Sequence, residues 1–185
     1  QMGSTSSDRG KSVAIDVNGN VYTTGWFEKK VDFDPGSDTS FLTTIGSTDI
    51  YIQKLDANGN LLWVKQIGGT SYDRSYAITT DKDSNVYSTG QFRGTVDFDP
   101  GPGIHNLVGE ANEEVYIQKL DANGNFIWAK RMGSRKDDKG NAIAIDASGN
   151  VITTGSFQGT VDFDPGPGVY NLTPGGTFFD VFIQK

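Results

Sequence analysis

The chain has 185 residues, no cysteine and a formal net charge of −7, and 19 of its 23 acidic residues are aspartate. The lack of cysteine excludes disulfides, zinc–thiolate sites and thiol catalysis. The acidic balance disfavours nucleic acid as a partner, and no apolar run is long enough for a membrane-spanning helix, so we expect no nucleic-acid binding and no membrane insertion.

In chain order, the first 65 residues predict four β-strands and no helix. Alternation of polar and apolar residues in VYTTG, IYIQK and LLWVK is typical of half-buried strands. The turns between paired strands read DVNGN and DANGN, and glycine there supplies the positive φ that a short hairpin loop needs. The predicted strands are Ser12–Asp16, Asn20–Phe27, Ile50–Leu55 and Leu61–Ile67.

This pattern recurs along the chain with a period of 65 residues. The hexapeptide VDFDPG begins at Val31, Val96 and Val161, and IQK recurs at 52, 117 and, displaced by one residue, at 183. Agreement between independent motifs at one spacing indicates a tandem repeat. We expect a single repeat array over 1–185, with approximate repeats 1–65, 66–130 and 131–185, the last incomplete.

A four-stranded antiparallel unit repeated in tandem predicts an all-β fold, and the best match is a set of β-propeller blades. The alternative is an open β-repeat array, although the coils of such arrays are usually shorter than 65 residues. Three units are fewer than a closed propeller needs. We therefore expect the chain to be a portion of a larger propeller, and the alternative is that several copies assemble.

The segments IYIQKLDANGNLLWVKQIGG and AIDVNGNVYTTG resemble the bacterial secreted β-propeller repeat family (SBBP-type repeats). The segment VDFDPGPG followed by Asn-Leu is similar to a variant blade of exported bacterial proteins. The resemblance covers essentially the whole chain. It implies an extracellular or cell-surface location and a scaffold or binding role, and it implies no catalytic residues.

The VDFDPG segments are the candidate metal sites. In an extended chain Val31 and Phe33 share one face, and Asp32 and Asp34 share the other, where two carboxylates need a compensating charge or donor. Calcium prefers carboxylate and carbonyl oxygens, so calcium is the cofactor we expect here. In the alternative, the first Asp caps loop amides and the second fixes the turn before proline. The candidate ligands are Asp32, Asp34, Asp97, Asp99, Asp162 and Asp164.

Other polar and aromatic residues have weaker cases. The DxNGN turns place oxygens at alternate positions, but hairpin chemistry explains them better than calcium does. Asp8, Asp73 and Asp138 precede a basic residue and are expected to join neighbouring units by hydrogen bonds. Trp26 has no Trp counterpart in the other repeats, so it is the candidate for an exposed ligand-binding aromatic. His105 is expected to be an exposed loop residue.

A catalytic residue normally breaks repeat symmetry, and the carboxylate pairs occur identically in all three repeats. We therefore expect a non-enzymatic structural, adhesive or interaction module of an extracellular bacterial protein. The expected partners are other blades of the same protein or other copies of the chain, and surface proteins or polysaccharide. The alternative is a carbohydrate-binding propeller or part of a polysaccharide-active enzyme.

Overall fold

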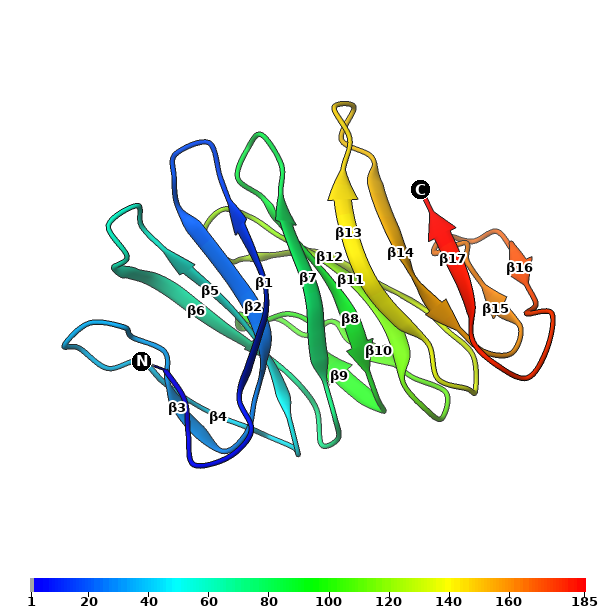
Figure 1. Ribbon diagram of the computed structural model, residues 1–185, viewed down its shortest axis with the longest axis horizontal. Coiled ribbons are helices and arrows are strands. Elements are labelled where there is room, and N and C mark those ends of the chain that lie inside the picture. The colour runs from blue at the N-terminus through cyan, green and yellow to red at the C-terminus, as the bar shows by residue number, and fades with distance from the viewer. Residues whose placement is uncertain (1) are drawn as a thin grey trace.

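The computed structural model describes residues 2–185, which form β-strands, turns and loops with no helix. Three main sheets lie side by side from the N-terminal to the C-terminal part of the chain (Figure 1). Each sheet is antiparallel and corresponds to one sequence repeat, so we call them blades 1, 2 and 3. The predicted all-β fold of tandem antiparallel blades is confirmed.

Blades 1 and 2 each contain four strands, and blade 3 contains three within the described residues. Blade 1 has the order β1 (Arg9–Ile15), β2 (Val21–Phe27), β5 (Asp49–Leu55), β6 (Leu61–Ile67). Blade 2 has the order β7 (Arg74–Thr80), β8 (Val86–Phe92), β11 (Glu114–Leu120), β12 (Phe126–Met132). Blade 3 has the order β13 (Lys139–Ile145), β14 (Val151–Phe157), β17 (Asp180–Gln184).

The segment between the second and third strands of each blade forms an additional two-stranded hairpin. The sequence predicted no strand between Phe27 and Ile50, but the VDFDPG motif begins inside the first short strand of this hairpin, where Val31 pairs with Leu42. The two apolar side chains of the motif, Val31 and Phe33, which the sequence placed on one face, are fully buried. The hairpin strands are β3 (Lys30–Asp32), β4 (Phe41–Thr43), β9 (Thr95–Asp97), β10 (Asn106–Val108), β15 (Val161–Asp162) and β16 (Asn171–Leu172).

The strand-connecting turns have the geometry that their sequences predict. The amide of Gly19 donates to the carbonyl of Asp16 at 3.0 Å, and Gly19 has a φ of 79°. Ser84 replaces this glycine in blade 2 and has a φ of 61°, which is uncommon for a residue with a Cβ atom. Its side chain lies near Asp16 of blade 1, and a hydrogen bond between them helps to lower the pKa of that carboxyl.

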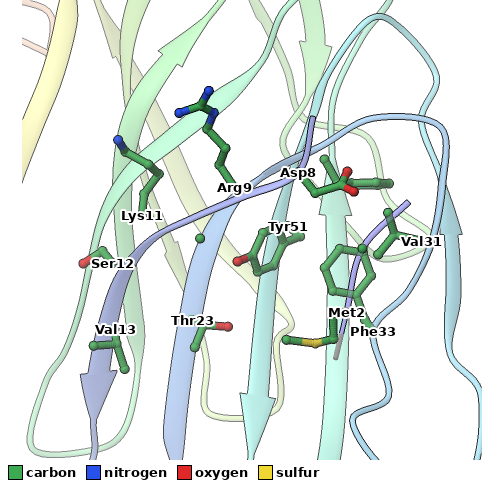
Figure 2. A pocket seen from close by; sticks show the side chains of 13 residues that line it. Met2, Asp8, Arg9, Lys11, Ser12, Val13, Thr23, Val31, Phe33 and Tyr51 are labelled. Carbon is green, nitrogen blue, oxygen red and sulfur yellow. The ribbon is translucent and has the colours of Figure 1, made fainter. Parts of the chain in front are cut away.

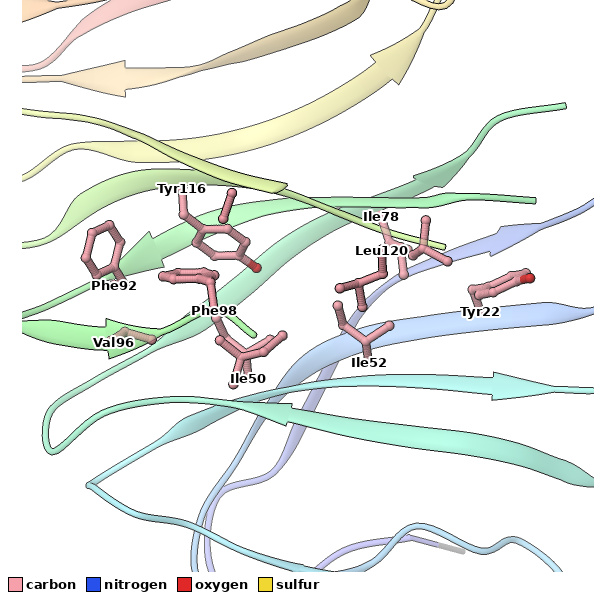
Figure 3. Packing of buried hydrophobic residues seen from close by; sticks show 12 residues of the cluster. Tyr22, Ile50, Ile52, Ile78, Phe92, Val96, Phe98, Tyr116 and Leu120 are labelled. Atoms are coloured by element: carbon pink, nitrogen blue, oxygen red, sulfur yellow. The ribbon is translucent and has the colours of Figure 1, made fainter. Parts of the chain in front are cut away.

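The hydrophobic core lies between the blades. Ile50 and Ile52 of blade 1 pack with Phe92, Phe98 and Tyr116 of blade 2 in one buried cluster (Figure 3). The ring of Phe98 lies 5.4 Å from that of Phe92 and 5.0 Å from that of Tyr116. Because successive side chains of a strand point to opposite faces, each blade contributes one row to the interface before it and another to the interface after it.

The same interface occurs a second time, between blades 2 and 3. Val115 and Ile117 of blade 2 replace Ile50 and Ile52, and they pack in a cluster with three blade-3 rings, Phe157, Phe163 and Phe182. The innermost strands β1, β7 and β13 are also neighbours. The chain is thus held together by two copies of one blade–blade contact.

Candidate interaction surfaces

The first carboxylate of each VDFDPG motif accepts backbone hydrogen bonds. Asp32 Oδ1 accepts from the amides of Asp34 at 3.0 Å and Ser40 at 2.8 Å. Asp97 and Asp162 make the corresponding contacts in the other two hairpins at the same distances. The amide of Ser40, followed by that of Asp34, holds the pKa of Asp32 below its usual value. This carboxylate therefore closes the hairpin loop.

The second carboxylate fixes the turn at proline. Asp34 Oδ1 accepts from the amide of Gly36 at 2.7 Å, and Asp99 and Asp164 accept from Gly101 and Gly166 at 2.8 and 2.7 Å. These contacts are the ones that the structural alternative predicted. Among residues 2–185, no group of three or more His, Cys, Asp or Glu side chains is arranged to hold a metal ion. Calcium binding by the six aspartates stays a prediction.

The aspartates of the hairpin turns also bind backbone amides. Asp16 Oδ1 accepts from Asn18 and Asn20 at 2.9 and 3.0 Å, and its Oδ2 accepts from the Tyr22 hydroxyl at 3.1 Å. Burial raises the pKa of Asp16, but the hydrogen bonds from Asn20 and Asn18 outweigh it and lower the pKa to about 2. The hairpin interpretation of these turns agrees with this geometry.

The link between two blades is organised around one buried aspartate. Asp73 Oδ2 accepts from the amide of Gly69 in the link at 2.7 Å, and its Oδ1 accepts from the amide of Arg93 at 3.1 Å. Burial raises the pKa of Asp73 to about 6, although these amides oppose the shift. The expectation that this residue fastens the link by hydrogen bonds agrees with the contacts.

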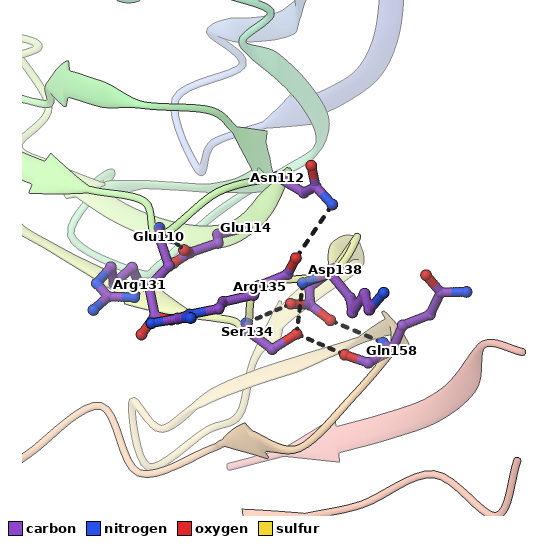
Figure 4. A network of polar contacts seen from close by, with 9 residues as sticks. Glu110, Asn112, Glu114, Arg131, Ser134, Arg135, Asp138 and Gln158 are labelled. Carbon is purple, nitrogen blue, oxygen red and sulfur yellow. Dashed lines mark hydrogen bonds and ion pairs between the residues drawn. The ribbon is translucent and has the colours of Figure 1, made fainter. Parts of the chain in front are cut away.

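Figure 4 shows the corresponding network before blade 3. Asp138 accepts from the amides of Ser134 at 2.6 Å and Gln158 at 2.9 Å, and burial raises its pKa to about 6. Beside it, the fully buried Glu114 forms an ion pair of 2.7 Å with Arg131. These contacts join the link to the end of β14 in blade 3, and the third strand of blade 2 to its outer strand, so the network stabilises the junction of two blades.

Trp26 is not the exposed aromatic that its lack of counterparts suggested. Its side chain is 8% exposed and packs edge-on against Tyr76 of blade 2, with ring centroids 5.8 Å apart. The Lys11 ammonium and the Arg74 guanidinium lie 5.4 and 5.2 Å from its ring centroid. The expectation of exposure was wrong, because the next blade covers a position that looks free within a single repeat.

His105 is half-buried, whereas the sequence predicted an exposed loop residue. Its ring lies 4.7 Å from that of Phe126, and its Nε2 lies 3.3 Å from the carbonyl oxygen of Ala129. Both contacts are with β12, the outer strand of the same blade. The histidine therefore fastens the insertion to its own sheet.

The side of the first blade that points away from blade 2 is only partly covered, because Val13 is 63% exposed whereas Phe27, Val31 and Phe33 are at most 2% exposed. A pocket of about 460 Å³ lies on it, lined by Phe27, Val31, Phe33 and the exposed Val13 (Figure 2). Met2 lies against Phe33 in this pocket, and its sulfur is 3.1 Å from Gln53 Nε2. We call Val13, Phe27, Val31 and Phe33 the upstream face.

The third blade carries an uncovered face on the opposite side. Val181 and Ile183 on β17 are each 75% exposed. They stand at the register positions of Ile50 and Ile52, since Ile183 pairs with Thr154 as Ile52 pairs with Thr24. We call Val181 and Ile183 the downstream face.

Neither face was identified from the sequence alone. The signal was present, because the segments IYIQK, VYIQK and VFIQK keep an apolar residue at both positions that become the downstream row. Only the stacking of the sheets shows that this row is a contact surface and that it is uncovered in blade 3.

The β-propeller repeat family (SBBP) matches residues 1–26 and 62–91 of the chain. The match over 62–91 covers β7 and nearly all of β6 and β8, and the match over 1–26 covers β1 and most of β2. The VDFDPG insertion lies outside them. The matches and the all-β sheets together support a β-propeller repeat fold.

Two curated proteins are similar to part of the chain. An uncharacterized WD repeat-containing protein of Acanthamoeba polyphaga mimivirus is 31% identical over 117 residues, which is 56% of this chain and 8% of that protein. The regulatory protein FlaEY of Caulobacter vibrioides is 26% identical over 127 residues, which is 66% of this chain and 13% of that protein. The similar region thus spans a small fraction of the length of each relative.

Proposed function

We propose that the chain is a non-enzymatic structural and interaction module of an extracellular bacterial protein, in which tandem blades form a scaffold for adhesion. The contact between successive blades, which occurs twice within the chain, is the observation that carries the proposal, since it stacks the sheets into one scaffold. The similarity to a WD repeat-containing protein and to a regulatory protein supports an interaction role.

The proposed partners follow from this contact between blades. The apolar face of a sheet packs better against another apolar sheet than against a hydrated polymer. Other blades of the same protein, other copies of the chain and surface proteins are therefore the proposed partners.

Cell-surface labelling tests the proposed location and role. Antibodies raised against the 185-residue chain are applied to intact and to permeabilised cells of the source bacterium. Labelling of intact cells, together with cross-linking of the chain to other surface components, is the expected result. Labelling that requires permeabilisation would contradict the extracellular location, and labelled cells without any cross-linked neighbour would contradict the interaction role.

A calcium contribution is a separate part of the proposal. The pairs Asp32/Asp34, Asp97/Asp99 and Asp162/Asp164 supply the carboxylate oxygens that calcium prefers. If calcium binds the folded chain, EDTA lowers the melting temperature and added calcium restores it. Magnesium is the control ion, since it demands a more rigid geometry. An unchanged melting temperature in EDTA would sink this part of the proposal.

The carbohydrate-binding alternative loses its candidate residue, because Trp26 lies between two blades. A glycan array probed with the labelled chain distinguishes the two functions. Binding to a defined polysaccharide, abolished by the soluble oligosaccharide, would favour the alternative. A turnover assay on polysaccharides with the intact parent protein tests the non-enzymatic assignment in the same way.

A further inference from the structure

The junction of blades 1 and 2 carries a cluster of basic and aromatic side chains near the start of the innermost strands. Lys11 of β1 and Arg74 of β7 both lie against the ring of Trp26, at 5.4 and 5.2 Å from its centroid. Tyr76 of β7 packs edge-on against the same ring, and the Lys11 ammonium lies 5.9 Å from the Tyr76 centroid. Trp26 itself is buried, whereas Lys11 is exposed and Arg74 is half-buried. We call Lys11 and Arg74 the cation pair.

The strand geometry keeps this part of the junction accessible. In each first strand the regular pairing with the second strand is interrupted at one residue, and these residues are Lys11, Tyr76 and Asn141. Such an irregularity re-aims a side chain relative to the sheet. Arg74 and Tyr76 belong to blade 2, which has a neighbouring blade on each side, and both remain half-buried and not fully buried. The opening at this position is therefore a property of the junction itself.

Neither member of the cation pair has an acidic partner. Within residues 2–185, the ion pairs involve other basic side chains. Arg74 Nε is buried and has no hydrogen-bond acceptor in the described part of the chain. Two like charges held at one ring repel each other, and contact with the ring attracts each cation without neutralising it. The pair therefore lacks the counter-charge that a purely structural network supplies.

The carboxyl groups around the cluster are engaged elsewhere. Asp73, the residue before Arg74, is fully buried and accepts hydrogen bonds from two backbone amides. Burial raises the pKa of Tyr76, Arg74 opposes this shift and Glu113 adds to it, so both charges act on the tyrosine. A hydrogen bond with Asp137, followed by burial, raises the pKa of Glu113 in turn. These groups therefore do not supply the missing counter-charge.

Of the two junctions within residues 2–185, only the first carries this cluster. The positions of Trp26 and Tyr76 are taken at the second junction by Gln91 and Asn141. The base that corresponds to Arg74 there lies over a phenylalanine ring of its own blade. The second junction buries its apolar cluster without a tryptophan or a cation pair, so packing between blades needs neither. A feature that one junction has and the other lacks indicates a task other than stacking.

We propose that the cation pair, Lys11 and Arg74, binds an oxyanion at the end of the innermost strands. The strands β1, β7 and β13 are neighbours, and in a propeller such strands surround the central channel (Figure 1). A guanidinium offers a planar fork of donors and an ammonium a rotatable point charge, which together suit carboxylate, phosphate and sulfate groups. Trp26 positions the two cations through its ring. Such a site goes beyond the proposed scaffold function and does not depend on it.

The indole N–H of Trp26 is a direct reporter of this site in NMR spectra of the ¹⁵N-labelled chain. Phosphate, sulfate and acetate are titrated separately, and sodium chloride keeps the ionic strength constant, because salt alone screens exposed charges. A saturable shift of the Trp26 signal is expected, and the anion that saturates at the lowest concentration identifies the oxyanion class. Trp63 and Trp128 lie on the outer strands β6 and β12, so their indole signals are internal references and should stay in place.

Charge-removing variants test which residues hold the anion. Arg74→Gln should weaken binding about tenfold or more, because it removes charge-assisted hydrogen bonds. Lys11→Gln should weaken it as well, and its exposed position keeps the test available if Arg74→Gln does not fold. Lys139→Gln is the matched control, since Lys139 has the same strand position at the second junction, without the tryptophan. It should bind with unchanged affinity.

Several outcomes would overturn the proposal. The first is a folded chain whose Trp26 signal shows no saturable shift with any of the three anions. The second is an equal shift with sodium chloride alone, which would mean screening and not binding. The third is an affinity that Lys11→Gln leaves intact, or that Lys139→Gln lowers to the same extent. Such results leave the scaffold function standing, since its own test is labelling and cross-linking on intact cells.

Discussion

Ile117 in blade 2 and Ile183 in blade 3 occupy the same position of the repeat, yet the first is 4% exposed and the second is 75% exposed. Both lie on the third strand, and both follow an aromatic residue that points to the other face of the sheet. The local structure is the same. What differs is the presence of a following blade, which covers Ile117 with Phe157 and Phe163.

The comparison shows where the stability of such an array resides. A single sheet leaves one row of apolar side chains uncovered on each face, and each added blade buries two rows at once. Stability then depends mainly on contacts between neighbours, as in other tandem-repeat proteins. A substitution should therefore have an effect that depends on its blade more than on its residue type.

The largest expected effect comes from truncating the two isoleucines. Ile117→Ala should lower the free energy of unfolding by ~2–5 kcal/mol, because it removes buried methyl groups and leaves a cavity. Ile183→Ala should change it by less than about 0.5 kcal/mol, as at other exposed positions. Urea unfolding at a protein concentration where the chain is monomeric measures both. Equal losses would contradict the rule that the stabilising effect of these isoleucines depends on whether the next blade covers them.

The next effect is a dependence of stability on pH that arises from the inter-blade links. Burial raises the folded-state pKa of Asp73 to about 6, well above the ordinary aspartate value of 3.8. Folding therefore favours the protonated form of Asp73. Its stabilising contribution to the free energy of unfolding is fully present below about pH 4 and is lost as the pH rises through 6. The loss is on the order of 2–3 kcal/mol.

Asp16 contributes with the opposite sign. Its folded-state pKa is lowered to about 2, so its contribution is present above pH 4 and is lost as pH falls towards 2. Maximum stability is therefore expected near pH 4–5. Urea midpoints between pH 2 and pH 7 test this, and Asp73→Asn should flatten the decline above pH 4. An unchanged slope in that variant would remove Asp73 as its cause.

Adding a methyl group at two glycines, one in a packed position and one in open space, should change the stability by a smaller amount. A Cβ atom at Gly133 would meet Glu114 Cγ at 2.5 Å, whereas a Cβ atom at Gly176, in the insertion of blade 3, would meet nothing within 4 Å. Gly133→Ala should cost ~1–3 kcal/mol through overpacking, and Gly176→Ala should be close to neutral. Thermal melting of the two variants compares them directly. A neutral Gly133→Ala would mean that the buried Glu114 has room to move.

The smallest effect concerns two turn aspartates at equivalent positions. Asp16→Ala leaves the buried Tyr22 hydroxyl and two backbone amides without their acceptor, and it should cost ~1–2 kcal/mol. Asp146 accepts from the equivalent amides of Ser148 and Asn150 in an exposed turn, so Asp146→Ala should cost about 0.5–1 kcal/mol. Chemical denaturation of both variants measures the difference. A larger loss for Asp146→Ala would contradict the rule that covered positions matter more.

Much of the fold was predictable because it depends on interactions between residues close in sequence. Alternation predicted the strands, and Asp, Asn and Gly predicted the turns between them. The packing of Val31 and Phe33 and the capping role open to Asp32 also followed from the local pattern. The insertion hairpin was missed, because its second strand is short and lies in a variable segment without an apolar alternation.

The candidate site was predicted less well, because exposure depends on distant residues. Trp26 looked free in one repeat and is covered by Tyr76, fifty residues along the chain. His105 looked like a loop residue and rests on Phe126. The exposed row of blade 3 was overlooked for the same reason, since Ile52 and Ile183 belong to the same motif and differ only in what covers them.

The sequence by itself determined the 65-residue period, the strand and turn pattern within it, and the alternation that gives each strand two apolar rows. These properties depend on backbone geometry and on neighbouring side chains. Only the tertiary structure decided which rows are buried, which carboxylates lie in a low-dielectric junction with raised pKa values, and which faces remain open. Burial is a property of the stacked sheets, so a residue repeated three times can have three different environments.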